Sequence, residues 1–214
     1  MNEVVYLLRQ GVGGMGVVLP AAAIGQLASY LELLAKWNRV YNLTAIREES
    51  KLVSHHVLDC LAVVGHLPDG NIVDIGSGAG LPGIPIAISC PDRAVTLLDS
   101  NHKKGAFLRQ AVAELGLSNS RVVTERAEAY RPAELFKTVI SRAFSDLADF
   151  VKLAGHLSAA DGVMIAMKGL RPDDEMARVP GPWKVSRTVR LEVPQVEASR
   201  HLVFLRPLSA TVPD

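Results

Sequence analysis

Three glycines stand at every second position after an aspartate: Asp74 is followed by Gly76, Gly78 and Gly80. Glycine reaches positive φ without strain and places no side chain between the backbone and a ligand. A short apolar run precedes this segment and a helical pattern follows it, so free amide groups at the helix start would face the same ligand. The segment is therefore predicted to be a cofactor-binding loop rather than a simple tight turn.

Two cofactors compete for this loop. The dinucleotide fingerprint G-x-G-x-x-G also fits, since it spans Gly78 to Gly83 and Asp99 follows Gly80 by nineteen positions. S-adenosylmethionine is favoured because the glycines begin earlier, as D-x-G-x-G-x-G, and because the carboxylate of Asp74 suits an ammonium and a sulfonium but repels a pyrophosphate. Asp99 is then expected to accept hydrogen bonds from ribose hydroxyls, with helix capping as its alternative role. The sequence also lacks a Tyr-x-x-x-Lys pair for hydride transfer by an NAD-dependent oxidoreductase.

Alternating short apolar runs and helical patterns predict the elements that position this loop. Five strands are expected, at residues 72–75, 94–98, 121–124, 138–141 and 162–167. Three helices are expected between them, at residues 82–90, 103–115 and 147–157. This alternation predicts an α/β fold with a parallel sheet and helices on both faces. Two later strand patterns, at 185–193 and 201–205, predict a terminal antiparallel hairpin and thus a mostly parallel seven-stranded sheet.

The first part of the chain has a different pattern. Residues 1–16 are rich in glycine without a sustained period and are expected to form a loose arm. Two helical patterns follow, from Pro20 to Trp37 and over residues 48–64. The chain is therefore expected to carry an N-terminal arm and helical extension over 1–66 and a methyltransferase domain over 67–214, packed as one unit.

Composition excludes several classes of protein. The 214 residues are 49% hydrophobic and have a formal net charge of +1, which argues against a disordered chain and against a basic nucleic-acid coat protein. No apolar run approaches the roughly 18–20 residues of a membrane span.

Cys60 and Cys90 form no disulfide framework and are interpreted as buried thiols of a reduced, cytoplasmic protein. The histidines show no metal-ligand spacing, so no metal is predicted, and a monomer is expected because no long apolar surface stripe is left over.

The charge is unevenly distributed along the chain. Residues 57–99 hold five aspartates and one arginine, a net charge of −4, and include the glycine loop. Residues 100–142 have a net charge of +4, and residues 168–206 one of +3. We expect the acidic block to hold a cationic cofactor and the basic segments to face a polyanion. The alternative is an ordinary solvated surface.

Several motifs occur together in one order. They are W-N-R-V-Y-N-L-T from Trp37, H-V-L-D from His56, D-I-G-S-G-A-G-L-P-G-I-P, L-L-D-S, V-I-S-R-A-F, Lys168-Gly169 and R-H-L-V from Arg200. The set, over residues 21–207, resembles the bacterial RsmG family, also called glucose-inhibited division protein B. The resemblance implies a Rossmann-like class I S-adenosylmethionine-dependent methyltransferase. It also implies methylation of N7 of a guanine in 16S ribosomal RNA, either naked or within a small-subunit precursor.

The resemblance also suggests which residues form the site. It places Gly76, Leu81 and Ala127–Glu128 at the cofactor and Arg142 at the junction of cofactor and substrate. With the glycine loop and Asp99, the expected cofactor set is Asp74, Gly76, Ser77, Gly78, Gly80, Leu81, Asp99, Ser100, Ala127, Glu128 and Arg142. The expected RNA contacts are Arg39, Lys103, Lys104, Arg200 and His201.

Guanine N7 carries a free lone pair and no proton, so direct SN2 attack on a sulfonium methyl needs no general base. The task is alignment of the reacting atoms, and Arg142 and Lys168 are the expected catalytic residues, through guanine O6 or a phosphate. The chain departs from the family at His55, where Arg is usual, and at Cys60, where Ser is usual. Histidine is only a titratable cation, so a phosphate contact there would be weaker. A non-catalytic RNA-binding module on the same fold is the remaining alternative.

Overall fold

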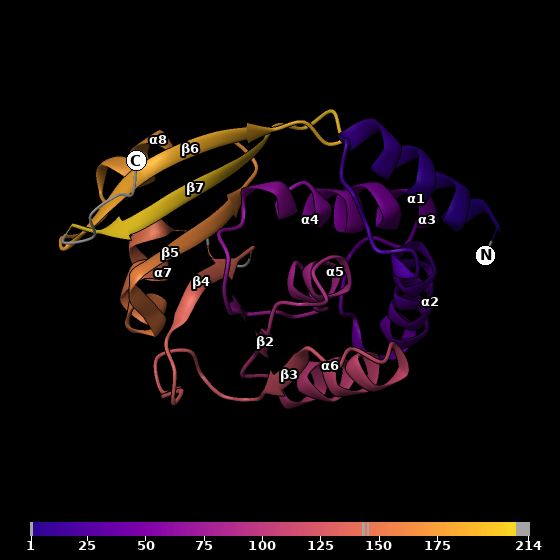
Figure 1. Ribbon diagram of the computed structural model, residues 1–214, viewed down its shortest axis with the longest axis horizontal. Coiled ribbons are helices and arrows are strands. Elements are labelled where there is room, and N and C mark those ends of the chain that lie inside the picture. The colour runs from indigo at the N-terminus through magenta and orange to yellow at the C-terminus, as the bar shows by residue number, and fades with distance from the viewer. Residues whose placement is uncertain (1, 143, 145, 209–214) are drawn as a thin grey trace.

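The computed structural model describes residues 2–142, 144 and 146–208 (Figure 1). Its seven strands are β1 Ile72–Ile75, β2 Val95–Leu98, β3 Ser120–Val123, β4 Phe136–Ser141, β5 Ser158–Lys168, β6 Trp183–Leu191 and β7 Arg200–Pro207. They form one sheet in the order β3-β2-β1-β4-β5-β7-β6.

The sheet is parallel from β3 to β5 and antiparallel at its other end. β1 pairs in parallel with β2 and β4, β2 with β3, and β4 with β5. β7 then runs antiparallel to β5, and β6 antiparallel to β7. The predicted mostly parallel sheet with a terminal antiparallel hairpin is confirmed. Every residue of β1 and β2 is buried, as expected for parallel strands that helices cover on both faces.

The helices before β4 all lie on one face of the sheet. They are α1 Asn2–Met15, α2 Ala23–Tyr41, α3 Glu49–Leu52, the π-helical η1 Val53–Leu58, α4 Asp59–Leu61, the short 3-10 helix η2 Val64–His66, α5 Gly83–Ser89 and α6 His102–Glu114. Their apolar side chains form one core cluster with that face. The cluster contains residues from both sides of the predicted boundary between residues 66 and 67. A second cluster on the other face contains α7 Leu147–Ala154 and the 3-10 helix η3 Gly155–Leu157. A short helix, α8 Asp173–Ala177, that the sequence pattern did not indicate packs near α7.

The predicted loose N-terminal arm is wrong, because residues 2–15 form helix α1. Val4 and Leu8 are buried against α2 and η1. Gly11 allows close packing, since a Cβ there would lie 2.3 Å from Cδ1 of Leu58. Tertiary packing of an apolar face thus overrides the low helix propensity of glycine.

The predicted helical segment over 48–64 is confirmed, but it contains a π-helical turn between α3 and α4. The amide of Asp59 donates to the carbonyl of Ser54, five residues earlier. Such turns occur mostly as single insertions in α-helices and often at functional sites. This one carries His55 and His56 toward the sheet edge described next. Among the described residues, no helix is long and apolar enough to cross a membrane.

Candidate active site

The residues expected to do chemistry meet at one edge of the sheet. Gly76, Asp99 and Arg142 directly follow β1, β2 and β4, so they lie at the carboxyl ends of parallel strands. This is where ligands bind in open α/β sheets. β7 runs antiparallel, and its first residues reach the same edge, where His201 pairs with Lys168.

The glycine loop has the left-handed backbone that its sequence predicts. The φ angles of Gly76, Gly78 and Gly80 are +68°, +57° and +86°. A Cβ at Gly80 would lie 2.3 Å from Cδ1 of Ile84, so this glycine is needed for packing. A Cβ at Gly78 would make only ordinary contacts, the nearest at 3.7 Å to the carbonyl of Gly76. The loop is therefore tightly packed at Gly80 and accessible at Gly76, which is exposed.

Asp74 supports the loop from beneath. It is fully buried, and its Oδ2 accepts the amide of Gly83 at 2.9 Å. Ser77 Oγ donates to the Asp74 carbonyl at 2.9 Å, and Asp74 Oδ1 has no hydrogen-bond partner among the described residues. Burial raises the pKa of Asp74 to about 7. The carboxylate that was expected to face the cofactor thus lies below the surface of the loop, as do Ser77, Gly80 and Leu81.

Asp99 connects this loop to the next helix. Its Oδ2 accepts the amide of Gly78 at 2.9 Å, and its Oδ1 accepts the amide of Asn101 at 2.8 Å. The cap of α6 is Asn101, whose side chain accepts the amides of Lys103 and Lys104, so the alternative capping role of Asp99 is wrong. A carboxylate has about four acceptor positions, and the remaining two are available to a ligand such as a ribose.

Two further segments surround the loop. Ser100 is exposed beside Asp99, and Ala127–Glu128 form a turn after β3, the strand next to β2. From below, Tyr30 of α2 donates its hydroxyl to the Ala79 carbonyl at 2.6 Å. Sequence reasoning missed Tyr30, because a buried aromatic on an apolar helical face has the pattern of an ordinary core residue.

A cavity of about 300 Å³ at the same edge of the sheet is lined by Arg142. It collects four of the predicted catalytic and RNA-binding residues, which are Arg142, Lys168, Arg200 and His201, together with His55, His56 and Asp59. Arg39 lines a neighbouring hollow of about 220 Å³ that shares Ile46 with this cavity. Lys103 and Lys104 lie elsewhere, at the start of α6 near the glycine loop.

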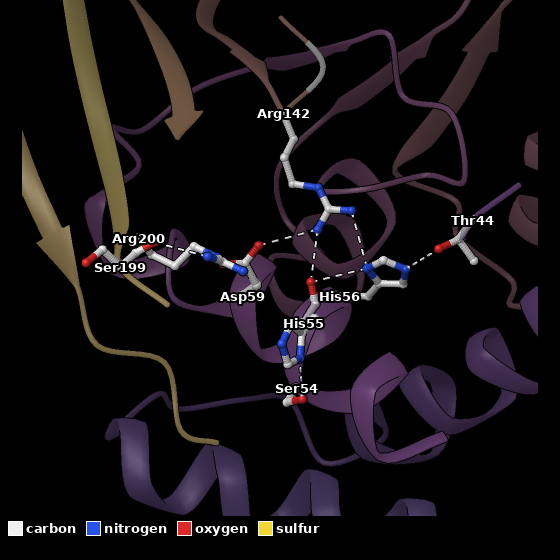
Figure 2. Close-up of polar contacts among 8 residues, drawn as sticks. All are labelled: Thr44, Ser54, His55, His56, Asp59, Arg142, Ser199 and Arg200. Carbon is white, nitrogen blue, oxygen red and sulfur yellow. Dashed lines mark hydrogen bonds and ion pairs between the residues drawn. The ribbon is translucent and has the colours of Figure 1, made fainter. Parts of the chain in front are cut away.

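Asp59 joins the two arginines of the cavity (Figure 2). Its Oδ2 lies 3.4 Å from Nη1 of Arg142, and its Oδ1 accepts Nε of Arg200 at 2.9 Å. Burial raises the pKa of Asp59, and the two arginines oppose that shift. Sequence analysis assigned Asp59 no role. The available signal was an acid three residues after His56 on the apolar side of a helical pattern, because side chains three apart share a helix face.

His56 is a neutral member of the same cluster. Burial, and then the nearby charge of Arg142, lower its pKa to about 4. Nδ1 lies 3.3 Å from Nη2 of Arg142, and Nε2 lies 2.8 Å from Oγ1 of Thr44 (Figure 2). Nδ1 also lies 3.2 Å from the carbonyl of His55, which can only accept a hydrogen bond, whereas the guanidinium of Arg142 can only donate. The two contacts of Nδ1 therefore correspond to different tautomers of the neutral ring. The amide of Thr44 donates to Oδ1 of Asn38 at 2.9 Å, which ties this histidine to α2.

Two predicted residues hold the cavity wall. Lys168 Nζ donates to Oε2 of Glu175 at 2.7 Å and to the carbonyl of Phe144 at 3.1 Å. Nδ1 of His201 lies 2.8 Å from the carbonyl of Gly169 and donates to it. Both side chains therefore line the cavity while their polar groups are engaged by the protein.

A family model described as rRNA small subunit methyltransferase G matches residues 23–203. The chain belongs to this family. A curated relative of that name from Laribacter hongkongensis is 52% identical over 198 residues, covering 92% of this chain and 96% of the relative. Another from Nitrosospira multiformis is 50% identical over 206 residues, covering 93% and 95%.

Two solved structures similar to this chain are described as S-adenosylmethionine-dependent methyltransferases. One from Aquifex aeolicus has a TM-score of 0.56 at 15% identity and covers 80% of this chain and 97% of its own. One from Thiobacillus denitrificans, in complex with S-adenosyl-L-homocysteine, has a TM-score of 0.52 at 12% identity and covers 82% and 97%. The fold is therefore the Rossmann-like class I methyltransferase fold that the sequence predicts.

Proposed function

We propose that this protein transfers a methyl group from S-adenosylmethionine to N7 of a specific guanine in 16S ribosomal RNA. The observation that carries the proposal is the family match over residues 23–203, because it joins a methyltransferase fold to small-subunit RNA. The geometry supports it, since the glycine loop and a cavity lined by Arg142 and other cationic side chains lie at the same edge of the sheet. An NAD-dependent reaction gains no support, because both the family and the similar structures are methyltransferases.

The residues of the loop fit S-adenosylmethionine. Gly76 and Ser100 are exposed, and Gly78 is half-buried. Asp99 accepts two backbone amides and lies 3.9 Å from Nζ of Lys104, and a carboxylate has about four acceptor positions, which leaves capacity for the ribose hydroxyls. Ala127–Glu128 lie on the adjacent strand end, where they would meet the adenine. Asp74, Ser77, Gly80 and Leu81 act by holding the loop. The bound cofactor supplies an electrophilic methyl group on a sulfonium.

The chain's own residues align the nucleophile. Guanine N7 attacks with its in-plane lone pair, so neither the neutral His56 nor another side chain has to remove a proton. Arg142 donates to guanine O6 or to a phosphate from its place in the cavity wall. Asp59 positions Arg142 and Arg200. Lys168 positions the chain after β4 by donating to the carbonyl of Phe144 and to Glu175, whose Oε2 also accepts the amide of Leu147. Fixed alignment of this kind is the main source of rate when no acid or base is required.

The remaining basic residues are proposed to contact RNA around the target base. Arg39 is exposed beside the cavity, and Lys103 is exposed at the start of α6 next to the cofactor loop. Phosphates are the usual partners of such residues. The substrate is proposed to be 16S RNA or a precursor of the small subunit in the cytoplasm. The protein is proposed to act on it as a monomer.

The test is to map modified guanines in small-subunit RNA from cells that lack or contain the gene. Chain scission at N7-methylguanine gives the position directly. We expect one guanine to be cleaved only when the gene is present, and to lose cleavage when the gene encodes Asp99→Ala. Identical cleavage patterns with and without the gene would overturn the proposal.

A further inference from the structure

The terminal hairpin has an unusual charge distribution. β6 and β7 carry five basic residues and no acid, and the basic residues are Lys184, Arg187, Arg190, Arg200 and Arg206. Only Arg200 belongs to the active-site cavity. The hairpin lies at one end of the molecule, away from α2 and α6 (Figure 1). A net charge of +5 on two strands calls for an explanation beyond the site described above.

A β-bulge brings two of these arginines to the same face of the hairpin. The pairing of β6 with β7 shifts between Val185 and Arg187. After the shift, Arg187 stacks on the ring of Phe204, 4.3 Å from its centroid. Arg206 is two residues beyond Phe204, so the alternation of a strand puts it on this face as well. Bulges commonly re-aim side chains in this way.

These arginines line a groove of about 410 Å³. Arg187, Phe204 and Arg206 form one wall, and His66 with the loop before β1 forms the other. We call this the hairpin groove. Burial, and then the charge of Arg187, lower the pKa of His66, so the two side chains are close enough to interact. The groove therefore has two arginines on one wall and a partly buried histidine on the other.

Shared lining residues place the hairpin groove and the active-site cavity on either side of one further hollow. A second hollow of about 440 Å³ shares Gly65 and His66 with the groove and shares Leu191 with the cavity. Arg190 and Glu192 also line this hollow, so its charges balance. From Arg200 to Arg206 the strand advances about 20 Å at 3.3 Å per residue. Arg200 and Arg206 are six residues apart and therefore share one face of the strand, which puts a cation at the active site and another in the groove on the same face.

Protection of an exposed sheet edge is the other reason for such charges, because β6 is the last strand of the sheet. That reason does not account for the two arginines, which lie over the face of the sheet and are held in place. Arg187 is fixed by Phe204, and Nη1 of Arg206 donates to the carbonyl of Asp161 at 3.1 Å. A guanidinium has five donors, so both retain donors for a planar anion.

We propose that the hairpin groove binds backbone phosphates of the substrate RNA beyond the target guanine. The inference rests on the proposed function, since it concerns the same RNA. Phosphate oxygens match the guanidinium fork of arginine. The groove would therefore set RNA affinity and its dependence on salt without touching the reacting atoms.

The test compares Arg187→Ala/Arg206→Ala with wild type on small subunits, and on protein-free 16S RNA, from cells that lack the gene. We expect KM for RNA to rise about tenfold at physiological salt and the slope of log affinity against log salt to shrink by roughly 1.5–2, as for two lost phosphate contacts. We expect kcat and the Kd for S-adenosylmethionine to stay unchanged. Arg187→Lys/Arg206→Lys should recover most of the slope, because the charge is kept.

Lys152→Ala is the matched control, because this exposed cation lies on α7, on the opposite face of the sheet. If Arg187→Ala/Arg206→Ala leaves the salt slope unchanged, or has no larger effect than the control, the proposal that the hairpin groove binds RNA phosphates is overturned. Altered sedimentation of the protein alone would also overturn it and assign the face to contact between copies. Absence of methyl transfer by wild type would overturn the proposed function instead. The groove would then be judged on equilibrium RNA binding by the same variants.

Discussion

The cofactor loop and the substrate cavity lie side by side but are held by different kinds of interaction. The loop is fixed mainly by backbone amides that bind nearby carboxylates, from Gly83 to Asp74, 9 positions away, and from Gly78 to Asp99, 21 positions away, with one longer-range bond from the Tyr30 hydroxyl to the Ala79 carbonyl. The cavity is fixed by charged side chains from distant segments. Asp59 contacts Arg142, 83 positions away, and Arg200, 141 positions away.

This difference determines how each part fails. A backbone-held loop fails when a side chain intrudes or a left-handed φ is lost, which is a local steric effect. A cavity held by a part-buried ion pair fails when one partner is removed, because the other charge is left without compensation. Damage to the cavity should therefore reach further than damage to the loop.

Asp59→Asn should break the cavity and spare the loop. Two arginines that are mostly buried lose their counter-charge, so we expect the free energy of unfolding to fall by about 3 kcal/mol. We expect methyl transfer to fall at least ~100-fold through misplacement of Arg142. We expect the Kd for S-adenosylmethionine to stay unchanged. Urea unfolding, a methyl-transfer assay and calorimetry with the cofactor, all on one preparation, measure the three quantities.

Asp69→Asn is the control, because Asp69 forms an exposed ion pair with Arg93. We expect it to change the free energy of unfolding by less than about 1 kcal/mol. A loss of cofactor binding in Asp59→Asn that matched its loss of transfer would contradict the separation of the two parts.

Gly80→Ala should weaken the loop and spare the cavity. The φ of +86° and the approach of 2.3 Å to Ile84 make alanine unfavourable, so we expect about tenfold weaker cofactor binding from a penalty of about 1–2 kcal/mol. RNA binding without cofactor should not change. Gly25→Ala is the matched control, because its Cβ would meet nothing within 4 Å on α2 and should stabilise the protein by roughly 0.5–1 kcal/mol. Equal effects of both substitutions on the cofactor Kd would refute the prediction.

The two parts should respond to pH in opposite directions. In the folded protein the pKa of His56 is lowered to about 4, so the unfolded chain takes up this proton first when the pH falls. Acidification from pH 7 to pH 5 therefore lowers the free energy of unfolding by about 2 kcal/mol through His56. The raised pKa of Asp74, about 7, means that the folded chain binds the extra proton, so its contribution adds stability as pH falls over this range.

His56→Gln should thus tolerate acid better than wild type, and Asp74→Asn should tolerate it worse. Urea unfolding at pH 7 and pH 5 checks both variants. A change of the same sign in the two would show that the shifted groups are not the ones identified.

The same contrast explains how much could be predicted from sequence. The glycine loop, its strand and its helix were predictable because local residue types dictate local backbone. Alternation of apolar runs and helical patterns predicted a parallel sheet with a terminal hairpin, whereas the order of the strands is known only from the structure. Helix α1 was missed, because its stability comes from Val4 and Leu8 packing on partners far along the chain.

For the cavity, the sequence predicted several of the lining residues but not the contacts that hold them together. Arg142, Lys168, Arg200 and His201 carried motif signals, and they do converge. Asp59 had no such signal of its role, because its two partners lie in segments that only the folded sheet brings together. Nor could sequence tell that Asp74 lies beneath the loop, since burial depends on packing by Gly83 and Leu97.

The most direct test of the two-part site is Arg142→Ala, assayed for methyl transfer to 16S RNA and for S-adenosylmethionine binding on the same preparation. Arg142 lies in the cavity cluster, held by Asp59 and His56. We predict that transfer falls at least ~100-fold, whereas the Kd for the cofactor changes by less than about threefold, because the side-chain hydrogen bonds described for Arg142 go to His55, His56 and Asp59 rather than to the glycine loop. Full methyl transfer, or a cofactor Kd that worsens in step with the rate, would contradict this account.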